Sequence, residues 1–305
     1  MRLDSDQELF KTAIEAVEKE NKILREYVEK DYWIVLLLKE IFHQDQEYVF
    51  KGGTSLSKCH RLIKRFSEDI DISYEEPFVE IDSNLKGKKF KGISRSIKAL
   101  NFALVNSERL KRTGYFNRFE CPYPSIFEDN KIEKKVIVEL AAQTPSFPCE
   151  EKQVQSFIGE YFDKTGRHDL TMKYELEPFI VKTQSLARTL VDKTFAICDY
   201  YLSNKCQKHS RHLYDITKIL TVINLDESVC DLFKQVKEYR KSSPICLSAK
   251  EGVVLSTILT SIVNEEVFKQ DYNKLTKPLL YEQCSYEACR SSLEELLSFL
   301  KLHSL

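Results

Sequence analysis

Two acidic residues, Asp69 and Asp71, flank a single apolar residue in the segment SEDIDIS. Side chains two residues apart on a strand point to the same face, with Cα atoms roughly 6.5 to 7 Å apart. Paired carboxylates at this spacing suit a hard cation such as Mg2+, which keeps several waters and takes further ligands from substrate phosphates. The pattern therefore predicts that Asp69 and Asp71 hold Mg2+, with Mn2+ as the alternative metal.

A third carboxylate would complete a two-metal arrangement, and Glu139 is the candidate for it. It lies in the segment EKKVIVELAAQ, where the β-branched residues 136–138 predict a short strand. If that strand paired beside the aspartates, it would bring Glu139 next to them as a metal ligand. Glu133 is a rival for this role, and a solvated position without any role is an equal alternative for Glu139.

Two glycines, Gly52 and Gly53, stand before Thr54 and Ser55 at the start of a helical pattern. Backbone N–H groups at the start of a helix favour phosphate, because they lie at the positive end of the helix dipole. A glycine pair alone is usually only a turn, and the P-loop pattern GxxxxGK[ST] does not occur in the sequence. However, the order of glycine turn, helix and acidic strand would bring a phosphate loop and a cation site to one end of a sheet. We therefore predict that residues 52–55 bind a nucleoside triphosphate.

The elements that position these residues follow from the spacing of apolar side chains. Residues 5–43 show the three- and four-residue spacings of two helices, residues 48–51 predict a short strand, and residues 54–64 a further helix. Residues 66–74 alternate with a period of two, which is typical of a strand with one buried face.

The second half of the chain differs from the first in its pattern. Apart from a strand pair expected around residues 170–181, it has helical spacings punctuated by prolines. The sequence therefore favours an α+β fold, with a small mixed sheet in residues 1–144 and a mainly helical domain in residues 145–305.

The composition limits the kinds of protein to which this chain could belong. The 46 basic and 47 acidic residues give a net charge of -1, so a surface for nucleic acid could only be local. The longest dense apolar run, residues 33–38, is far too short to span a membrane, and residues 1–20 lack the order of a signal peptide. Nine cysteines without a CxxC pair indicate reduced thiols. We therefore expect a cytoplasmic protein that does not associate with a membrane.

Four strings in the sequence resemble one protein family: DYW at residues 31–33, FKGGTSLSKCHRLIKRFSEDIDIS at 50–73, RTLVDK at 188–193 and RHLYDI at 211–216. They are similar to the AbiEii/AbiGii-type toxin nucleotidyltransferases, which are bacterial proteins of type IV toxin–antitoxin systems and of abortive phage infection. The resemblance covers about residues 24–220. It implies the DNA polymerase β-like nucleotidyltransferase fold, a helical C-terminal domain that completes the active-site cleft, and a cognate antitoxin.

The resemblance also implies roles at named positions. Lys193 falls where the family contacts the phosphates of the triphosphate, and Arg188 on the same predicted helix is a further nucleotide-binding candidate. Asp215 falls at a position that the family uses in catalysis. We expect Lys193 to be accessible, and Arg211 and Asp215 are spaced so that they could pair on a helix surface. The catalytic residues expected are thus Asp69, Asp71, Lys193 and Asp215.

A strongly basic stretch lies between these motifs. Residues 86–112 contain nine Lys or Arg residues and one acid, Glu108, while Ile93 and Ile97 have the spacing of a helix. RNA phosphates are the partner expected for the polar face of this helix, whose candidate contacts are Lys88, Lys89, Lys91, Arg95 and Lys98. A solvated face, or a surface that docks the antitoxin, is the alternative.

Ser67 shares a face with Asp69 by strand alternation, so it would lie close to a nucleotide bound there. Our hypothesis is that Ser67 is modified with phosphate or nucleotide, and that this modification silences the enzyme.

The expected function is that of a toxin that transfers nucleotides from a nucleoside triphosphate to RNA and so inhibits translation and growth. The 3′ end of a transfer RNA, as the acceptor, is implied by the resemblance alone. Two alternatives stay open: the same chemistry with a protein or small-molecule acceptor, and a catalytically silent binding module that keeps the fold.

Overall fold

The computed structural model describes residues 1–75, 83–110, 116–128 and 132–305, and for residues 83–90 it describes the backbone alone. The chain forms two compact units, each built from several stretches. The first unit contains Met1–His60, Ser67–Gln143 and Cys149–Thr183, and the second contains Arg61–Phe66, Thr144–Pro148 and Gln184–Leu305. The predicted domains, residues 1–144 and 145–305, are contiguous segments, and this division stays a prediction.

The first unit is built on a six-stranded sheet with the strand order β3-β4-β2-β1-β6-β5. Strands β1 and β2 pair antiparallel, as do β3 and β4, whereas β2 with β4 and β1 with β6 are parallel. The predicted mixed sheet is therefore confirmed. The strands are β1 (Tyr48–Lys51), β2 (Asp69–Tyr74), β3 (Phe116–Pro122), β4 (Lys135–Ala141), β5 (Cys149–Val154) and β6 (Phe179–Gln184).

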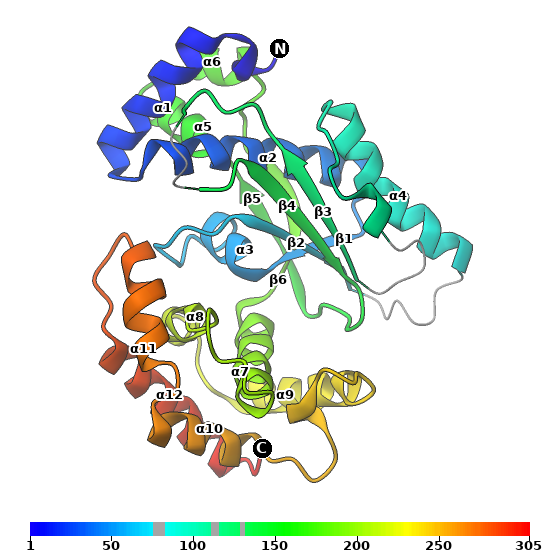
Figure 1. Ribbon diagram of the computed structural model, residues 1–305, viewed down its shortest axis with the longest axis vertical. Helices are drawn as coiled ribbons and strands as arrows, with labels where there is room; N and C mark the ends of the chain where they lie inside the picture. The colour runs from blue at the N-terminus through cyan, green and yellow to red at the C-terminus, as the bar shows by residue number, and fades with distance from the viewer. Residues whose placement is uncertain (76–82, 111–115, 129–131) are drawn as a thin grey trace. The chain divides into compact units, whose positions relative to one another are not determined.

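Helix α2 organises the packing of the first unit. It crosses the sheet in Figure 1, contacts β2 and β4, and also packs against α1, α4 and α5. The strand residues Ile70, Ile72 and Val138 are fully buried, as are Leu37 and Leu38 of α2. The helices of this unit are α1 (Gln7–Asn21), α2 (Arg25–Gln44), α3 (Gly52–Lys58), α4 (Ser83–Ala99), α5 (Phe157–Lys164) and α6 (His168–Lys173).

Two elements of this unit differ from the sequence prediction. Helix α3 begins at Gly52 and ends at Lys58, so it is shorter than the helix expected over residues 54–64. Only the second half of the strand pair expected around residues 170–181 is a strand, because residues 168–173 form α6. The Thr171 hydroxyl of that helix donates to the carboxylate of Asp163 in α5 (2.8 Å), a contact that holds α6 in place and that apolar spacing cannot reveal.

The second unit is mainly helical, as the sequence predicts. Helix α7 packs against α8, α9 and α10, while α12 packs against α8 and α10. Phe195 and Phe233 are fully buried between these helices, with ring centroids 6.1 Å apart. Its helices are α7 (Leu186–Leu202), α8 (Arg211–Leu220), α9 (Glu227–Lys241), α10 (Leu255–Glu265), α11 (Lys269–Asp271) and α12 (Tyr286–Leu302).

Across the part of the chain that the structure describes, no helix combines the length and the apolar character needed to cross a membrane.

Candidate active site

The glycine bend and the acidic strand meet within the first unit. Strands β1 and β2 pair so that Lys51 lies opposite Asp71, and Gly52 follows immediately with a φ of +78°. A Cβ atom placed on Gly52 would stand 1.9 Å from Oδ2 of Asp71. The carboxylate therefore occupies the space that any other side chain at position 52 would need, and the left-handed φ also favours glycine.

Hydroxyl groups at the start of α3 stabilise this bend. The buried Thr54 donates a hydrogen bond from Oγ1 to the backbone oxygen of Asp69 (2.6 Å), which ties α3 to β2. The buried Ser55 donates from Oγ to the backbone oxygen of Gly52 (3.0 Å). Both side chains are thus used inside the protein, so the phosphate contacts predicted for residues 52–55 would come mainly from backbone N–H groups.

Glu139 stands beside Asp71 in the sheet. The parallel register of β2 and β4 pairs Asp71 with Glu139 and Asp69 with Ile137. Directly paired residues project to the same face, so Glu139 lies on the face of the aspartates. The rival Glu133 is exposed before the start of β4, and its carboxylate lies 3.1 Å from Nζ of Lys135. The geometry therefore favours Glu139 over Glu133 as the third carboxylate, and its role as a metal ligand stays a prediction.

An arginine that sequence reasoning missed joins the carboxylates. Arg118 on β3 pairs with Glu139 in the antiparallel register, and its Nη1 donates to Oε1 of Glu139 (2.5 Å). Burial acts to lower the pKa of Arg118, but Glu139 and, to a smaller extent, Asp69 raise it above the ordinary value. The alternation of polar and apolar residues over 118–121 was the available signal for this strand.

The donor set of the first unit suits a hard cation. Asp69 and Asp71 offer carboxylate oxygens on one face of β2, next to the glycine bend. Within the described residues, the group of three ligands whose atoms all lie within 4.8 Å of one another is Glu227, Cys230 and His303 in the second unit. The ligand atoms of the three carboxylates of the sheet are therefore more widely spread than those of this group.

A buried ionic triad forms in the second unit. Asp215 on α8 has no exposed surface, and Nε and Nη2 of Arg65 donate to its two carboxylate oxygens (2.8 and 2.7 Å). Nζ of Lys193 on α7 donates to the same carboxylate (2.6 Å). Burial acts to raise the pKa of Asp215, but the charges and hydrogen bonds of Arg65 and Lys193 hold it well below its ordinary value.

The triad corrects two expectations. Lys193 was expected to be accessible, but it is only 6% exposed because it reaches inward to Asp215. Asp215 binds Arg65 and Lys193, whereas Arg211, one turn before it on α8, is exposed. Arg65 lies 150 residues from Asp215 along the chain, so the helix spacing that suggested a partner for Asp215 could not have indicated it.

Arg188 is also part of the interior of the second unit. Its guanidinium donates to Asp192 (3.3 Å) and to the backbone oxygen of Phe147 (3.0 Å), and it lies over the Phe147 ring. These contacts account for its burial, and a role in nucleotide binding stays a prediction.

Ser67 lies immediately before β2. Its Oγ is 3.1 Å from Oγ1 of Thr54, the residue that is tied to Asp69. The side chain is partly exposed and stands two residues before the first aspartate. Its modification stays a hypothesis, and the structure gives Ser67 a neighbour on α3 that belongs to the predicted phosphate loop.

The basic helix α4 has the predicted two-sided character. Lys91, Arg95 and Lys98 are exposed, whereas Ile93 and Ile97 are buried. The side chains of Lys88 and Lys89 lie outside the described residues. The spacing of the three exposed cations places them on one face of α4.

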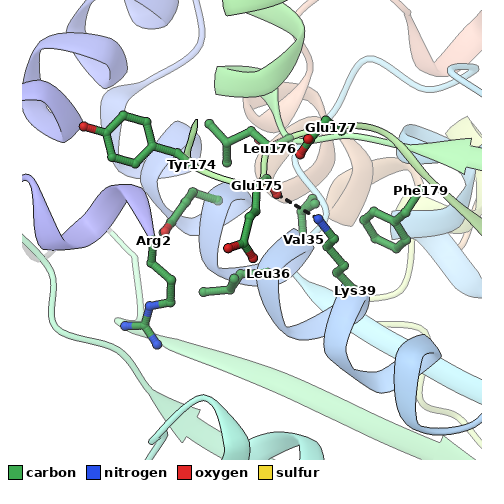
Figure 2. A pocket seen from close by; sticks show the side chains of 11 residues that line it. Arg2, Val35, Leu36, Lys39, Tyr174, Glu175, Leu176, Glu177 and Phe179 are labelled. Atoms are coloured by element: carbon green, nitrogen blue, oxygen red, sulfur yellow. Dashed lines mark hydrogen bonds between the residues drawn. The ribbon is translucent and has the colours of Figure 1, made fainter. Parts of the chain in front are cut away.

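Two neighbouring hollows of the first unit lie away from the predicted site. One is a cavity of about 50 Å3, shown in Figure 2, where Nζ of Lys39 donates to the backbone oxygen of Glu175 (2.8 Å). The other is a groove of about 780 Å3 that shares Lys39, Glu175 and Phe179 with the first. None of the residues that line these two hollows is a predicted site residue.

The sequence matches the model of one known protein family. The model of the family described as "Nucleotidyl transferase AbiEii toxin, Type IV TA system" matches residues 36–297, which is most of the chain. A comparison with curated proteins gives no match.

Two solved structures are similar to this chain over most of its length. MenT4, a nucleotidyltransferase toxin from Mycobacterium tuberculosis H37Rv, is 15% identical in sequence, with a TM-score of 0.55 over 94% of this chain and 89% of that one. JHP933 from Helicobacter pylori is 16% identical, with a TM-score of 0.41 over 90% of this chain and 92% of that one. The likeness to MenT4 shows the fold, and the family match covers all the predicted site residues.

Proposed function

Because the chain belongs to the AbiEii nucleotidyltransferase toxin family of type IV toxin–antitoxin systems, we propose that it transfers nucleotides from a triphosphate to RNA in a Mg2+-dependent reaction. The acceptor in this proposal is the 3′ end of a transfer RNA, and the consequence is inhibition of translation and growth. The observation that supports the proposal most is the contact of Asp71 with Gly52, which joins carboxylate ligands for a cation to a bend suited to phosphate.

The proposed reaction forms one bond and breaks one. A hydroxyl oxygen of the acceptor attacks the α-phosphorus of the triphosphate, the bond between the α-phosphorus and the bridging oxygen breaks, and pyrophosphate leaves while the hydroxyl proton passes to a base or to water. Mg2+ held by Asp69 and Asp71 would offset negative charge on the phosphates. Glu139, paired with Asp71 in the sheet, is the group proposed to orient the attacking hydroxyl or to share a second cation.

Lys193 and Asp215 are proposed from the family positions that they occupy. A lysine contributes a point charge that can stabilise the charge of a transferring group. In the structure this charge is held by Asp215, which also binds Arg65, so the side chain of Lys193 has a fixed position within the second unit. Arg65 is therefore proposed as a residue that positions both of them.

An antitoxin partner follows from membership of the family. For the RNA acceptor, the support is the row of exposed cations on α4, Lys91, Arg95 and Lys98, which is suited to a phosphate backbone.

The proposal is tested by supplying each labelled triphosphate in turn with Mg2+, total RNA and total protein from a bacterial lysate. We expect one label to be retained on RNA of transfer-RNA size, and Asp69→Ala to abolish the transfer. Label on protein would replace the RNA acceptor by the alternative one, and binding of triphosphate without turnover would indicate a silent module. Expression of the native protein should slow bacterial growth; an equally toxic Asp69→Ala variant would show that toxicity does not arise from this chemistry.

A further inference from the structure

Helix α2 carries three consecutive charged residues that are almost completely buried. The exposed fractions of Glu29, Lys30 and Asp31 are 1%, 0% and 4%. Burial of a charge is costly unless the charge is paired and hydrogen-bonded. Each of the three has partners, and these partners lie on different segments of the first unit.

Asp31 holds the far end of α3. It forms an ion pair with Lys58, the last residue of α3, and its Oδ2 accepts a hydrogen bond from the backbone N–H of Phe157 (2.7 Å). Lys58 in turn donates to the backbone oxygen of Gln155 (3.3 Å), and its Nζ lies 3.5 Å from the centroid of the Phe157 ring. Both charges are therefore enclosed, and α3 is fixed against α2 and the start of α5.

Lys30 holds the starts of the two strands that bear the carboxylates. It forms an ion pair with Glu68, which immediately precedes Asp69, and donates to the backbone oxygen of Glu133 (3.1 Å), shortly before β4. One buried ammonium group thus joins the entry to β2 with the entry to β4. The register of these strands is what sets Asp71 beside Glu139.

Glu29 holds the connection between β3 and β4. Its carboxylate accepts from the backbone N–H of Ile126 (2.7 Å) and from the hydroxyl of Ser125 (2.7 Å). These two strands carry Arg118 and Glu139, which pair with each other.

Residues 29–31 of α2 thus bind segments that lead into the strands and the helix of the candidate site. We propose that Lys30 and Asp31 are positioning residues for nucleotide transfer, an inference that rests on the proposed function. Asp31 acts through Lys58 on α3, and so keeps Gly52 against the carboxylate of Asp71. Lys30 acts on the relative position of β2 and β4, and so sets the spacing of the carboxylates.

The two residues should therefore give different kinetic signatures. Loss of the Asp31–Lys58 pair should mainly raise the KM for the triphosphate, because it loosens the glycine bend that is proposed to bind the phosphates. Loss of Lys30 should act mainly on kcat and on the Mg2+ concentration required, because it shifts the carboxylates. A purely structural role would change stability and the fraction of active protein without separating these parameters.

The sharpest variant replaces both charges of one pair. Removing a buried ion pair as a whole is often neutral in stability, whereas removing one partner leaves a buried charge. We therefore expect the double variant Asp31→Leu/Lys58→Met to fold, with KM for the triphosphate raised about tenfold and kcat changed by less than about threefold, a tenfold change in binding corresponding to about 1.4 kcal/mol. The single variant Lys58→Arg, which keeps the positive charge beside Asp31, should keep the wild-type KM. Lys30→Met should lower kcat and raise the Mg2+ requirement.

Ile14→Ala, a cavity variant in the buried face of α1, is the control for general loss of stability and should leave KM and the Mg2+ requirement unchanged. The inference is overturned if the double variant folds with wild-type KM, or if Ile14→Ala changes KM to the same extent. Equilibrium binding of labelled triphosphate to the wild type separates the two levels of the proposal. If the wild type binds and transfers the nucleotide, and Asp31→Leu/Lys58→Met and Lys30→Met have the same KM, kcat and Mg2+ requirement, only the positioning role fails. If the wild type neither binds nor transfers the nucleotide, the proposed function fails as well.

Discussion

The carboxylate of Asp71 lies against Gly52 so closely that a Cβ at position 52 would stand 1.9 Å from its Oδ2. Gly52→Ala should therefore displace the carboxylate and reduce nucleotide transfer at least a hundredfold. Gly166→Ala is a matched control in the same unit, because Gly166 also has a positive φ, +74°, but a Cβ placed on it would meet nothing within 4 Å. Both variants carry the backbone strain of a positive φ. Transfer assays should separate them, and equal activities would argue against a role for this contact.

The buried triad of the second unit gives a ranking of stabilities. Asp215→Asn leaves two buried cations without their carboxylate, so we expect it to lower the free energy of unfolding by about 3–5 kcal/mol. Lys193→Met should cost less, because the bidentate pair of Arg65 with Asp215 remains. Urea denaturation measures both values, and the reverse order would contradict this account. Loss of activity in a Lys193 variant must accordingly be compared with its stability.

The same carboxylate predicts a dependence on pH. The pKa of Asp215 is lower in the folded protein than its ordinary value, so its ionised form stabilises the fold above the unfolded pKa of about 3.9. This contribution is lost as the pH falls from there through the folded pKa. The difference in unfolding free energy between the wild type and Asp215→Asn should therefore be largest near neutral pH and shrink below about pH 4. Urea denaturation at a series of pH values would show this, and a difference independent of pH would count against it.

Ser67 provides a test of regulation. A phosphate or nucleotide on its hydroxyl would add negative charge two residues before Asp69, which should repel the triphosphate. We expect an increase in intact mass after incubation with triphosphate, absent in Ser67→Ala, and reduced transfer by Ser67→Glu. The Ser67→Ala variant should itself stay active. An unchanged mass in every condition counts against the hypothesis.

The exposed cations of α4 should govern binding of RNA. Replacing Lys91, Arg95 and Lys98 by Gln should weaken binding and lower the slope of log K against log salt by about two to three, one for each lost phosphate contact. The control replaces three exposed lysines of α1 and its C-terminal end, Lys11, Lys19 and Lys22. Filter binding at several salt concentrations distinguishes the two sets, and an equal effect of both would indicate only a general charge effect.

Local pattern was sufficient for some features of the site and not for others. Alternation around Ile70 and the glycine pair before a helix predicted a strand and a bend, and the structure places Asp71 against Gly52. The mixed sheet and the mainly helical second half were also predicted. The individual strands and helices depend on residues close together in the chain, which periodicity can report.

The rest depends on pairings between distant residues. Arg65 meets Asp215 across 150 residues, and Lys58 meets Asp31 from another helix. A helical pattern predicts that Lys193 lies on a helix, but not that its side chain points inward to the buried carboxylate of Asp215. For the same reason Arg118 was missed, because its partner Glu139 is defined by strand order rather than by spacing.

Each compact unit is assembled from three separate stretches of chain, and residues 61–66, which carry Arg65, interrupt the first unit immediately before the acidic strand. A cut at any single point would therefore leave one unit with pieces on both fragments. No contiguous segment of the chain contains one complete unit and nothing of the other. Recombination that moves a single contiguous segment of the gene therefore could not transfer either unit alone. The two units are thus expected to be inherited together, and a shuffled relative should keep both or neither.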